Sequence, residues 1–437
     1  MSSKKSILSF YFNTSLVVRI FVALIAGIIV GMIFTAGELP NGELNLGAKM
    51  IGFLTPFGDL FVRLLKMIMV PIIICSLIIG TSSIAPSHLG KVGVKAVFFY
   101  FVTTVFAIII GLGCGLLFAP GSGLELSDAS IAIAKEAHSE PLSKIFLNMI
   151  PTNPFESIVK GDILPIITFC IFLGIGLAFI RDSDDERIKK AGDTVYNFFD
   201  GMSEIMFKVV RWVMEYAPIG VFALMFVVFS ANGATAFGSL ANVTAALYTG
   251  LVLQVVLVYF GICLLIGLKP LEFLKKVRAP MITAFVTRSS NGTLPITMDV
   301  TDKEMGVPRS IYGFVLPVGA TVNMNGTTVY LGVCTLFIAN ACGIDLTSSQ
   351  YVTIVITAIL AAIGTAGIPG AGALMLLLVL ESIGIKVDGN VAIAYAMILG
   401  IDALLDMGRT SMNVVGDVIA SIWVAKTEGE LNMSKWK

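Results

Sequence analysis

Long apolar stretches separated by short polar connections run along almost the whole chain. Most of them exceed the roughly 20 residues that a helix needs to cross a membrane. This pattern predicts an all-α polytopic membrane protein. Full helical spans are expected at 16–36, 48–73, 92–118, 142–181, 190–231, 240–267, 308–341 and 391–426.

Two further apolar segments, 270–302 and 349–384, are interrupted in the middle. The first contains RSSNGTLP at 288–295 and the second contains GTAGIPGAG at 364–372. Each half is too short for a span, and Gly and Pro allow a sharp reversal. We therefore expect two re-entrant helical hairpins whose tips reach the membrane interior, each followed by a long helix with polar residues in its middle. A unit that occurs twice from opposite sides is the inverted repeat typical of a secondary transporter.

The composition agrees with this pattern. Of 437 residues, 56% are hydrophobic and 13% are charged, and the mean hydropathy is +0.92, whereas soluble domains have about 25% charged residues. The net charge of zero gives no indication of a nucleic-acid partner. The six cysteines are scattered without C-x-x-C spacing, which indicates core residues rather than disulfides or metal ligands. No organic cofactor is expected.

The distribution of basic residues sets the expected orientation. The connection at 232–239 has no charge, whereas the opposite side contains Lys4, Lys5, Lys91, Lys95, Arg187, Lys189, Lys190, Lys269, Lys275, Lys276, Arg278, Lys303 and Arg309. By the positive-inside rule both termini are expected to be cytoplasmic, and the number of full spans is then even. The start MSSKKSILSF is followed by no small-residue cleavage site. The first span is therefore expected to act as the insertion signal.

The last predicted helix has a polar stripe on one face. At about 100° per residue its members fall within an arc of roughly 100°. They are Asp402, Asp406, Arg409, Thr410, Asn413 and Asp417. A carboxylate at bilayer depth costs several kcal/mol unless it is paired, hydrated or bound to an ion. The stripe therefore predicts a polar site inside the membrane.

The chemistry of this stripe suits an acidic α-amino acid. Arg409 cannot lose its proton and requires an anionic partner. An ion pair with Asp406, one turn away, is the purely structural alternative, but it leaves Asp402 and Asp417 without partners. In the functional interpretation Asp406 binds a substrate ammonium and Arg409 binds a side-chain carboxylate. The α-carboxylate would rest against hairpin-tip amides and Ser290, since open helix ends have unpaired N–H groups. Neutral hydrogen bonds would come from Thr327, Thr410 and Asn413.

The same region offers oxygen ligands for a hard cation such as Na⁺. Asp417 and Asp402 supply charge, and unwound backbone near Gly319, Asn323 and Asn413 can supply carbonyl oxygens. The tip of the second hairpin can add Ile363 and Thr365, opposite Thr321. Three residues with hydroxyl groups, Tyr100, Thr103 and Thr104, lie in the third span and could add ligands. Alternatively, the threonine hydroxyls could simply donate to the i−4 carbonyls of their own helix, which is common in membrane helices.

The glycine-rich tip of the second hairpin is expected to act as a lid. It lacks the Lys of a phosphate-binding loop and follows no strand, so nucleotide binding is not expected. A tip of small residues can instead close when substrate and ions are bound. The lid residues would be Gly367, Ile368, Pro369, Gly370, Ala371 and Gly372.

Four ordered motifs give the chain a family resemblance. They are RSSNGTLPITM, GATVNMNGTTVYLGV, GTAGIPGAGALML and ILGIDALLDMGRTSMNVVGDVIASIWVAKTEG. They resemble the signature segments of the dicarboxylate/amino acid:cation symporter family, which contains the excitatory amino acid transporters and prokaryotic glutamate and aspartate transporters. PTNPF at 151–155, MEYAPIGVFAL at 214–224 and KMIMVPIIICSLIIG at 66–80 extend the resemblance to nearly the whole chain.

The resemblance implies a glutamate-transporter-like fold of eight spans and two hairpins, assembled as a homotrimer in a bacterial or archaeal plasma membrane. Residues 1–437 would form one transporter unit with an elevator-type mechanism, in which a transport part slides through a scaffold. The scaffold would comprise about 1–90 and 142–231, and the transport part about 91–118 and 240–426. The implied activity is uptake of L-glutamate or L-aspartate coupled to Na⁺, or to protons in some bacterial members.

The family's site residues carry over by motif. Substrate would be bound by Ser290, Thr327, Asp406, Arg409, Thr410 and Asn413. One Na⁺ site would be lined by Asp417, Asn323 and Asn413, and another by Thr321, Ile363 and Thr365. A third would involve Tyr100, Thr103, Thr104 and Asn323.

Three positions depart from the family pattern. The family usually has Asp where this chain has Asn325, and that Asp supplies the charge of the third Na⁺ site. An amide keeps the oxygen but loses the charge, which weakens cation binding in a low-dielectric site, so we expect fewer coupled Na⁺ ions here. Leu331 replaces a Glu that the eukaryotic members use for proton transfer, so that proton route is absent. Asn291 replaces a small residue usual at the first hairpin tip.

Several alternatives stay open at this point. Arg409 argues against neutral amino acids and Asp406 disfavours C4-dicarboxylates, while cystine transport is open. An intramembrane aspartyl protease needs two carboxylates from separate helices that share a proton. Here the candidate carboxylates share one helix with an Arg, so no enzyme is expected. The paired hairpins favour alternating access over a simple ion channel.

Overall fold

The structure, a computed structural model, describes residues 14–37, 43–82, 91–124, 126, 147–233, 235–365, 367 and 369–436. Within these ranges the regular structure is helical, which confirms the predicted all-α fold class. The elements in the first half are α2 (Leu16–Ile33), α3 (Leu46–Ser82), α4 (Lys91–Phe118), α6 (Pro154–Lys160), α7 (Ile163–Arg181), α8 (Glu186–Asn232), α9 (Thr235–Leu253), the π-helix η3 (Gln254–Tyr259) and α10 (Phe260–Leu265).

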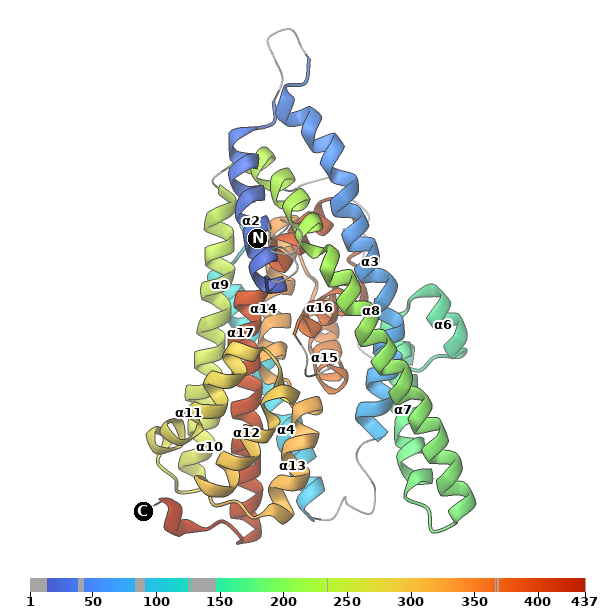
Figure 1. The fold of residues 1–437 in the computed structure, drawn as a ribbon, viewed down its shortest axis with the longest axis vertical. Coiled ribbons are helices and arrows are strands. Elements are labelled where there is room, and N and C mark those ends of the chain that lie inside the picture. The colour runs from blue at the N-terminus through green and yellow to red at the C-terminus, as the bar shows by residue number, and fades with distance from the viewer. Residues whose placement is uncertain are drawn as a thin grey trace, which may run out of the picture.

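The second half of the chain continues from α11 to the C-terminal end (Figure 1). Its elements are α11 (Pro270–Thr287), α12 (Ser290–Lys303), α13 (Arg309–Val322), α14 (Asn325–Ala341), α15 (Ser348–Gly364), α16 (Ala371–Ser382), α17 (Gly389–Glu428) and the 3₁₀ helix η4 (Met433–Trp436). Seven of the described helices, taking α9–α10 and α13–α14 as continuous, are long and apolar enough to cross a membrane. A further apolar helix covers Val18–Ile33. The count of eight spans therefore stays a prediction.

The expected span at 142–181 is wrong in its extent. The membrane-length helix α7 begins only at Ile163, and the short helix α6 precedes it. Residues 142–146 lie outside the described part of the chain. Asn153 caps α6 by accepting a hydrogen bond from the Phe155 amide at 3.1 Å, and Pro154 is its first residue. Gly161 ends α6 in the left-handed region at φ 75°, which only glycine adopts freely.

Both interrupted segments form helical hairpins, as predicted. Hairpin 1 consists of α11 and α12 and reverses at Arg288 and Ser289; hairpin 2 consists of α15, which ends at Gly364, and α16, which begins at Ala371. Their four helices have 18, 14, 17 and 12 residues, each less than the roughly 20 that a full span requires. The predicted span 308–341 is itself interrupted, because α13 ends before Asn323 and α14 begins at Asn325.

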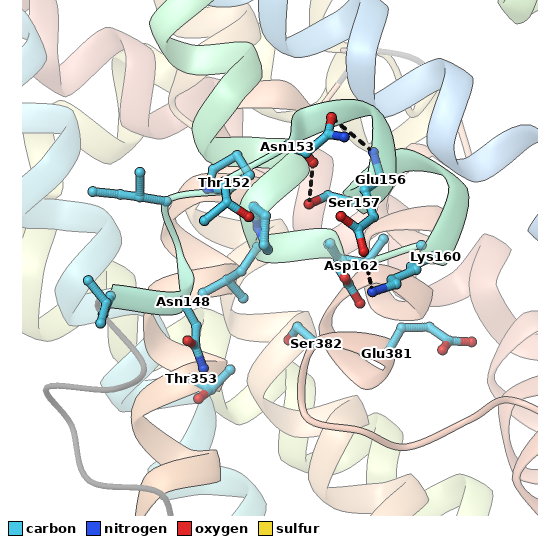
Figure 2. Close-up of a pocket in the computed structure, with 17 residues that line it drawn as sticks. Asn148, Thr152, Asn153, Glu156, Ser157, Lys160, Asp162, Thr353, Glu381 and Ser382 are labelled. Carbon is cyan, nitrogen blue, oxygen red and sulfur yellow. Dashed lines mark hydrogen bonds and ion pairs between the residues drawn. The ribbon is translucent and has the colours of Figure 1, made fainter.

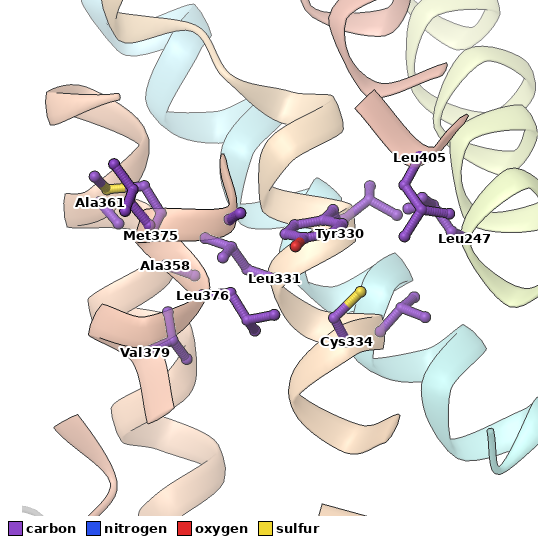
Figure 3. Close-up of a cluster of buried hydrophobic side chains, with 14 of the residues drawn as sticks. Leu247, Tyr330, Leu331, Cys334, Ala358, Ala361, Met375, Leu376, Val379 and Leu405 are labelled. Atoms are coloured by element: carbon purple, nitrogen blue, oxygen red, sulfur yellow. The ribbon is translucent and has the colours of Figure 1, made fainter. Parts of the chain in front are cut away.

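The helices pack in two groups. One group contains α2, α3, α7 and α8, with α8 lying along both α2 and α3. The other contains α4, α9 and the helices from α11 to α17, with α17 contacting α11, α13 and α14 (Figure 1). Helix α14 is buried over almost its whole length among α4, α16 and α17. Figure 3 shows the contact of α14 with α16, where Leu331 of α14 faces Leu376 of α16. The polar stripe of α17 therefore lies at the centre of the second group.

Candidate functional site

The six polar residues of the α17 stripe are all buried in the second group of helices. They face the tips of both hairpins and the interruption between α13 and α14. Arg409 is only 1% exposed and Asp406 only 2%. The structure therefore places the charges of the stripe inside protein, as a chain at membrane depth requires.

Arg409 makes ion pairs on its own helix. Its Nε donates to Asp406 Oδ1 at 2.9 Å, and its Nη1 donates to Asp402 Oδ1 at 3.0 Å. The guanidinium also lies 4.5 Å from the centre of the Tyr330 ring. The intrahelical pair offered as the structural alternative is thus present. Asp402, considered above as a source of charge for a cation, is placed beside Arg409 instead.

Asp406 joins both hairpins to α17. Its Oδ2 accepts a hydrogen bond from the Gly370 amide of hairpin 2 at 3.2 Å and lies 3.9 Å from Arg288 Nη1 of hairpin 1. Its Oδ1 also accepts a hydrogen bond from the Thr410 hydroxyl at 3.0 Å. Arg288 was not among the predicted site residues. A charged residue in the middle of an apolar re-entrant segment was the signal that could have identified it.

All six predicted substrate residues line one small cavity between the hairpin tips. These residues are Ser290, Thr327, Asp406, Arg409, Thr410 and Asn413. Arg288 and Gly372 also line it. The cavity has only about 10 Å³, which is close to the space of one water molecule. An amino acid can enter only if one of the surrounding segments moves.

The hairpin 2 tip packs against the Arg409 guanidinium and covers this cavity on that side. A Cβ added to Gly372 would lie 2.6 Å from Arg409 Cζ, so a larger residue here would have to displace the guanidinium from its ion pairs. The Gly367 carbonyl accepts hydrogen bonds from the Ser289 hydroxyl at 2.8 Å and from the Asn291 amide at 3.3 Å. Of the predicted lid residues, Ile368 lies outside the described part of the chain. Of the described lid residues, Gly367 joins the two hairpin tips by hydrogen bonds.

Asp417 and Asn323 form the best candidate for a cation site. Asn323 Nδ2 donates to Asp417 Oδ1 at 2.8 Å, and Asn323 Oδ1 is buried without a hydrogen-bond partner among the described residues. A Cβ at Gly319 would lie 2.5 Å from Asp417 Oδ1 and 2.9 Å from the Tyr100 hydroxyl oxygen. A carboxylate, an unpaired amide oxygen and closely approaching backbone are a donor set that fits a hard cation. Asn413 borders the same region, where its Oδ1 accepts a hydrogen bond from the Gly326 amide at 2.7 Å.

The region around Asn325 is a closed network of neutral groups. Thr104 donates to Asn325 Oδ1 at 2.9 Å, and Asn325 Nδ2 donates to the Tyr259 hydroxyl at 2.9 Å. The Thr103 hydroxyl donates to the Phe99 carbonyl of its own helix at 2.9 Å. The i−4 hydrogen bond considered above therefore explains Thr103, whereas Thr104 bonds to Asn325 instead. Both ends of the amide are satisfied without a charge. These residues do not fit a cation as the Asp417 region does.

Two members of this network were missed by sequence reasoning. Tyr259 and Gln254 belong to the π-helix η3, and Gln254 Nε2 donates to the Thr103 carbonyl at 3.2 Å. Their signal was polarity within the predicted span at 240–267. A π-helical turn inside a helix is itself often found at functional sites.

The remaining predicted cation ligands lie at the junction of hairpin 2 and α13. Thr321 and Thr365 donate their hydroxyls to carbonyls of their own helices, at 3.0 and 2.7 Å. The Ile363 carbonyl lies against α3, since a Cβ at Gly80 would be 2.9 Å from its oxygen. A Cβ at Gly367 would lie equally close, 2.9 Å, to the Ala320 carbonyl. The structure thus brings these segments together without a hydrogen bond from either threonine across the junction.

A larger cavity of about 880 Å³ lies away from the stripe, between the α6–α7 junction and the base of hairpin 2. Figure 2 shows Glu156 and Lys160 on its rim, with Thr353, Glu381 and Ser382 of hairpin 2 opposite. The hydrogen bond from Lys160, at 2.6 Å, holds the pKa of the Glu156 carboxyl below its usual value. This cavity contains no residue of the α17 stripe.

Comparisons with known proteins match nearly the whole chain. A family model described as the sodium:dicarboxylate symporter family matches residues 16–427. The proton/sodium-glutamate symport protein of Bacillus caldotenax is 36% identical over 427 residues, 96% of each chain. The proton/glutamate-aspartate symporter of Escherichia coli (strain K12) is 34% identical over 396 residues, 88% of each chain. The C4-dicarboxylate transport protein of Bacillus subtilis (strain 168) is 31% identical over 428 residues, covering 96% of this chain and 95% of that one.

Proposed function

The chain belongs to the sodium:dicarboxylate symporter family, and we propose that it imports L-glutamate or L-aspartate together with Na⁺. Membership makes it a membrane transport protein for acidic substrates driven by coupled cations, and not an enzyme. The choice of amino acid and of Na⁺ is the proposal. The observation that supports it most is the small cavity that all six expected substrate residues line.

The charges around the cavity match the three charged groups of an acidic amino acid. Asp406 would bind the ammonium, and Arg409 would exchange one of its two intrahelical carboxylates for the substrate side-chain carboxylate. The α-carboxylate would lie at Ser290, in the first turn of α12, where backbone N–H groups favour an anion. A C4-dicarboxylate has no ammonium to offset Asp406, which favours an amino acid.

Na⁺ would be bound by Asp417, Asn323 and Asn413, and at the junction of Thr321, Ile363 and Thr365. Bound there, it would supply positive charge beside the substrate. At the third family position, Asn325 is satisfied by Thr104 and Tyr259. We therefore expect fewer than three coupled Na⁺ ions. A reversal-potential measurement that gives three Na⁺ per substrate would refute this expectation.

The proposed movement is a displacement of one group of helices against the other. The scaffold would comprise about 1–90 and 142–231, and the transport part about 91–118 and 240–426, in a homotrimer. The separate packing of the two groups supports this division. The hairpin 2 tip packs near the C-terminal end of α3, because a Cβ at Gly364 would lie 2.5 Å from Leu77 Cδ2. If the termini are cytoplasmic, this arrangement corresponds to the inward-displaced state in a prokaryotic cell membrane.

Uptake of radiolabelled L-aspartate into proteoliposomes tests the proposal. We expect uptake under an inward Na⁺ gradient, competition by L-glutamate, and no uptake by an Asp406→Ala variant. Uptake driven by a proton gradient alone would replace Na⁺ by H⁺ as the coupling ion. Failure under both gradients, with uptake of succinate instead, would overturn the amino-acid assignment in favour of the C4-dicarboxylate class.

A further inference from the structure

The C-terminal segment Glu430–Trp436 folds back over the base of hairpin 1. Helix α17 ends at Gly429, which adopts a left-handed φ of 77° and lets the chain reverse. The segment then crosses the loop 304–308 between α12 and α13. The Asn432 amide donates to the Gly306 carbonyl at 3.0 Å, and Trp436 Nε1 donates to the Met305 carbonyl at 2.8 Å. Figure 1 shows this end of the chain beside the lower ends of α12 and α13.

Lys276 of α11 joins three segments at one point. Its Nζ donates to the Glu304 carbonyl at 2.9 Å and also to the Lys435 carbonyl. The same ammonium lies 4.6 Å from the centre of the Trp436 ring, a cation–π geometry. The first limb of hairpin 1, the loop after its second limb and the C-terminal segment are therefore tied by one side chain.

The contact is closely packed as well as hydrogen-bonded. Trp436 is 7% exposed, and Leu431 and Met305 are also buried. Gly306 has a left-handed φ of 71°, and a Cβ there would lie 3.0 Å from Asn432 and Lys435 atoms. An exposed tail would need neither this glycine nor a buried tryptophan.

The base of hairpin 2 is held differently. Its two limbs are joined by Gln350, whose Nε2 donates to the Ile383 carbonyl at 2.9 Å. At this base an ion pair of Glu381 with Lys66 of α3, at 3.4 Å, joins side chains that are 24% and 33% exposed. Partly exposed ion pairs of this kind are weak, and among the described residues no segment lies across this base as the C-terminal segment lies across that of hairpin 1.

We propose that residues 430–436 form a strap that fixes hairpin 1 to α17. The strap makes hairpin 1 and the last helix one body, so that Ser290 and Arg288 keep their positions beside Asp406. The effect of the strap on the substrate cavity rests on the proposed transport function; the rigidity of hairpin 1 does not.

Hydrogen exchange of the full-length protein in lipid nanodiscs tests the strap. The variants are a chain that stops after Gly429 and the point variant Trp436→Ala, with Ser434→Ala as the matched control. Ser434 lies in the same segment and is exposed, and within the described part of the chain its side chain bonds to Asn432 alone. We expect amide exchange in α11 and α12 to rise on the order of tenfold in both variants, while α15 and α16 stay unchanged. The control is expected to match the unmodified protein.

Two results would overturn the strap. Unchanged amide exchange in α11 and α12 would show that residues 430–436 do not stabilise hairpin 1. An equal rise in exchange in both hairpins would show a general loss of stability. Trp436→Phe retains the ring beside Lys276 and is expected to give an intermediate rise. Because the readout needs no substrate, a protein that fails to transport aspartate can still support the strap, and an active transporter can still refute it.

Discussion

The two hairpins have the same two-helix architecture, but they are attached to the rest of the protein in different ways. Hairpin 1 lies along α17, has the C-terminal segment across its base, and places Arg288 and Ser290 at its tip. Hairpin 2 contacts α17 mainly through its tip, where the backbone of Gly370 and Gly372 approaches Asp406 and Arg409. One hairpin offers fixed side chains to the cavity, and the other offers small residues that cover it.

This difference separates two tasks that a transporter site must perform. Selective binding requires charged and hydroxyl groups at fixed positions, because a displaced group loses its hydrogen bonds. Opening requires a segment whose contacts are few and weak enough to break. The inverted repeat thus supplies two similar units, and the attachments of each unit decide which task it performs.

Loss of the Arg409 charge, beside the hairpin 2 tip, should have the largest effect on substrate binding. Arg409→Ala leaves Asp402 and Asp406 buried without their main partner, a change that costs about 3–5 kcal/mol where it has been measured. We expect aspartate binding, measured by calorimetry, to weaken at least 100-fold, by the same scale. Arg409→Lys keeps the charge but not the fork and should bind only slightly better. Normal binding by Arg409→Ala would remove this residue from the substrate site.

A matched pair of glycines sharpens the comparison directly. Gly372→Ala places a Cβ 2.6 Å from Arg409 Cζ, whereas Gly292→Ala in hairpin 1 meets only Ser289 atoms at 3.2 Å or more. Overpacking of the first kind costs about 1–3 kcal/mol. We expect Gly372→Ala to weaken aspartate binding by roughly 10- to 100-fold and Gly292→Ala to change it little. Equal effects would mean that the two tips do not differ in how they close.

Ser289 and Thr347 test the link between the hairpins through two helix caps. The Ser289 hydroxyl accepts a hydrogen bond from the Gly292 amide and donates to the Gly367 carbonyl of hairpin 2, whereas Thr347 caps α15 at the base of hairpin 2. Loss of either cap costs about 0.5–2 kcal/mol of stability. An Ala371→Cys substitution places a thiol at the hairpin 2 tip, where its rate of reaction with a thiol reagent reports opening. Only Ser289→Ala should also raise this rate, by up to roughly tenfold. A similar rise with Thr347→Ala would assign the effect to general destabilisation.

Much of this arrangement could be predicted because the membrane restricts the sequence. Hairpins at 270–302 and 349–384 followed from Gly and Pro inside apolar segments, and the α17 stripe followed from its period. The six substrate residues lie around one cavity because helical spacing already placed four of them on one face of α17. The start of α7 was missed, since the predicted span ran through Lys160, Gly161 and Asp162, a short polar break that in fact ends α6 and precedes α7.

Contacts between segments distant in the sequence could not be predicted from the pattern alone. Arg288 reaches α17, Tyr259 reaches α14 and Gln254 reaches α4. No local period in the sequence indicates these contacts. The C-terminal strap depends on a hydrogen bond from Trp436 to the Met305 carbonyl, which lies 131 positions earlier in the chain.

The smallest expected effect concerns the base of hairpin 2. Lys66→Ala removes the ion pair between α3 and Glu381, which is partly exposed and therefore contributes only about 0.2–1 kcal/mol. Since this pair joins the two groups of helices, its loss should shift their relative position by a factor of up to about five in population. Spin-label distances between α3 and α16 would report the shift. Lys160→Ala breaks a pair within α6 and should leave those distances unchanged, because Glu156 and Lys160 lie on one element. If both variants shift the distances equally, the Lys66–Glu381 pair does not hold hairpin 2 in its present position.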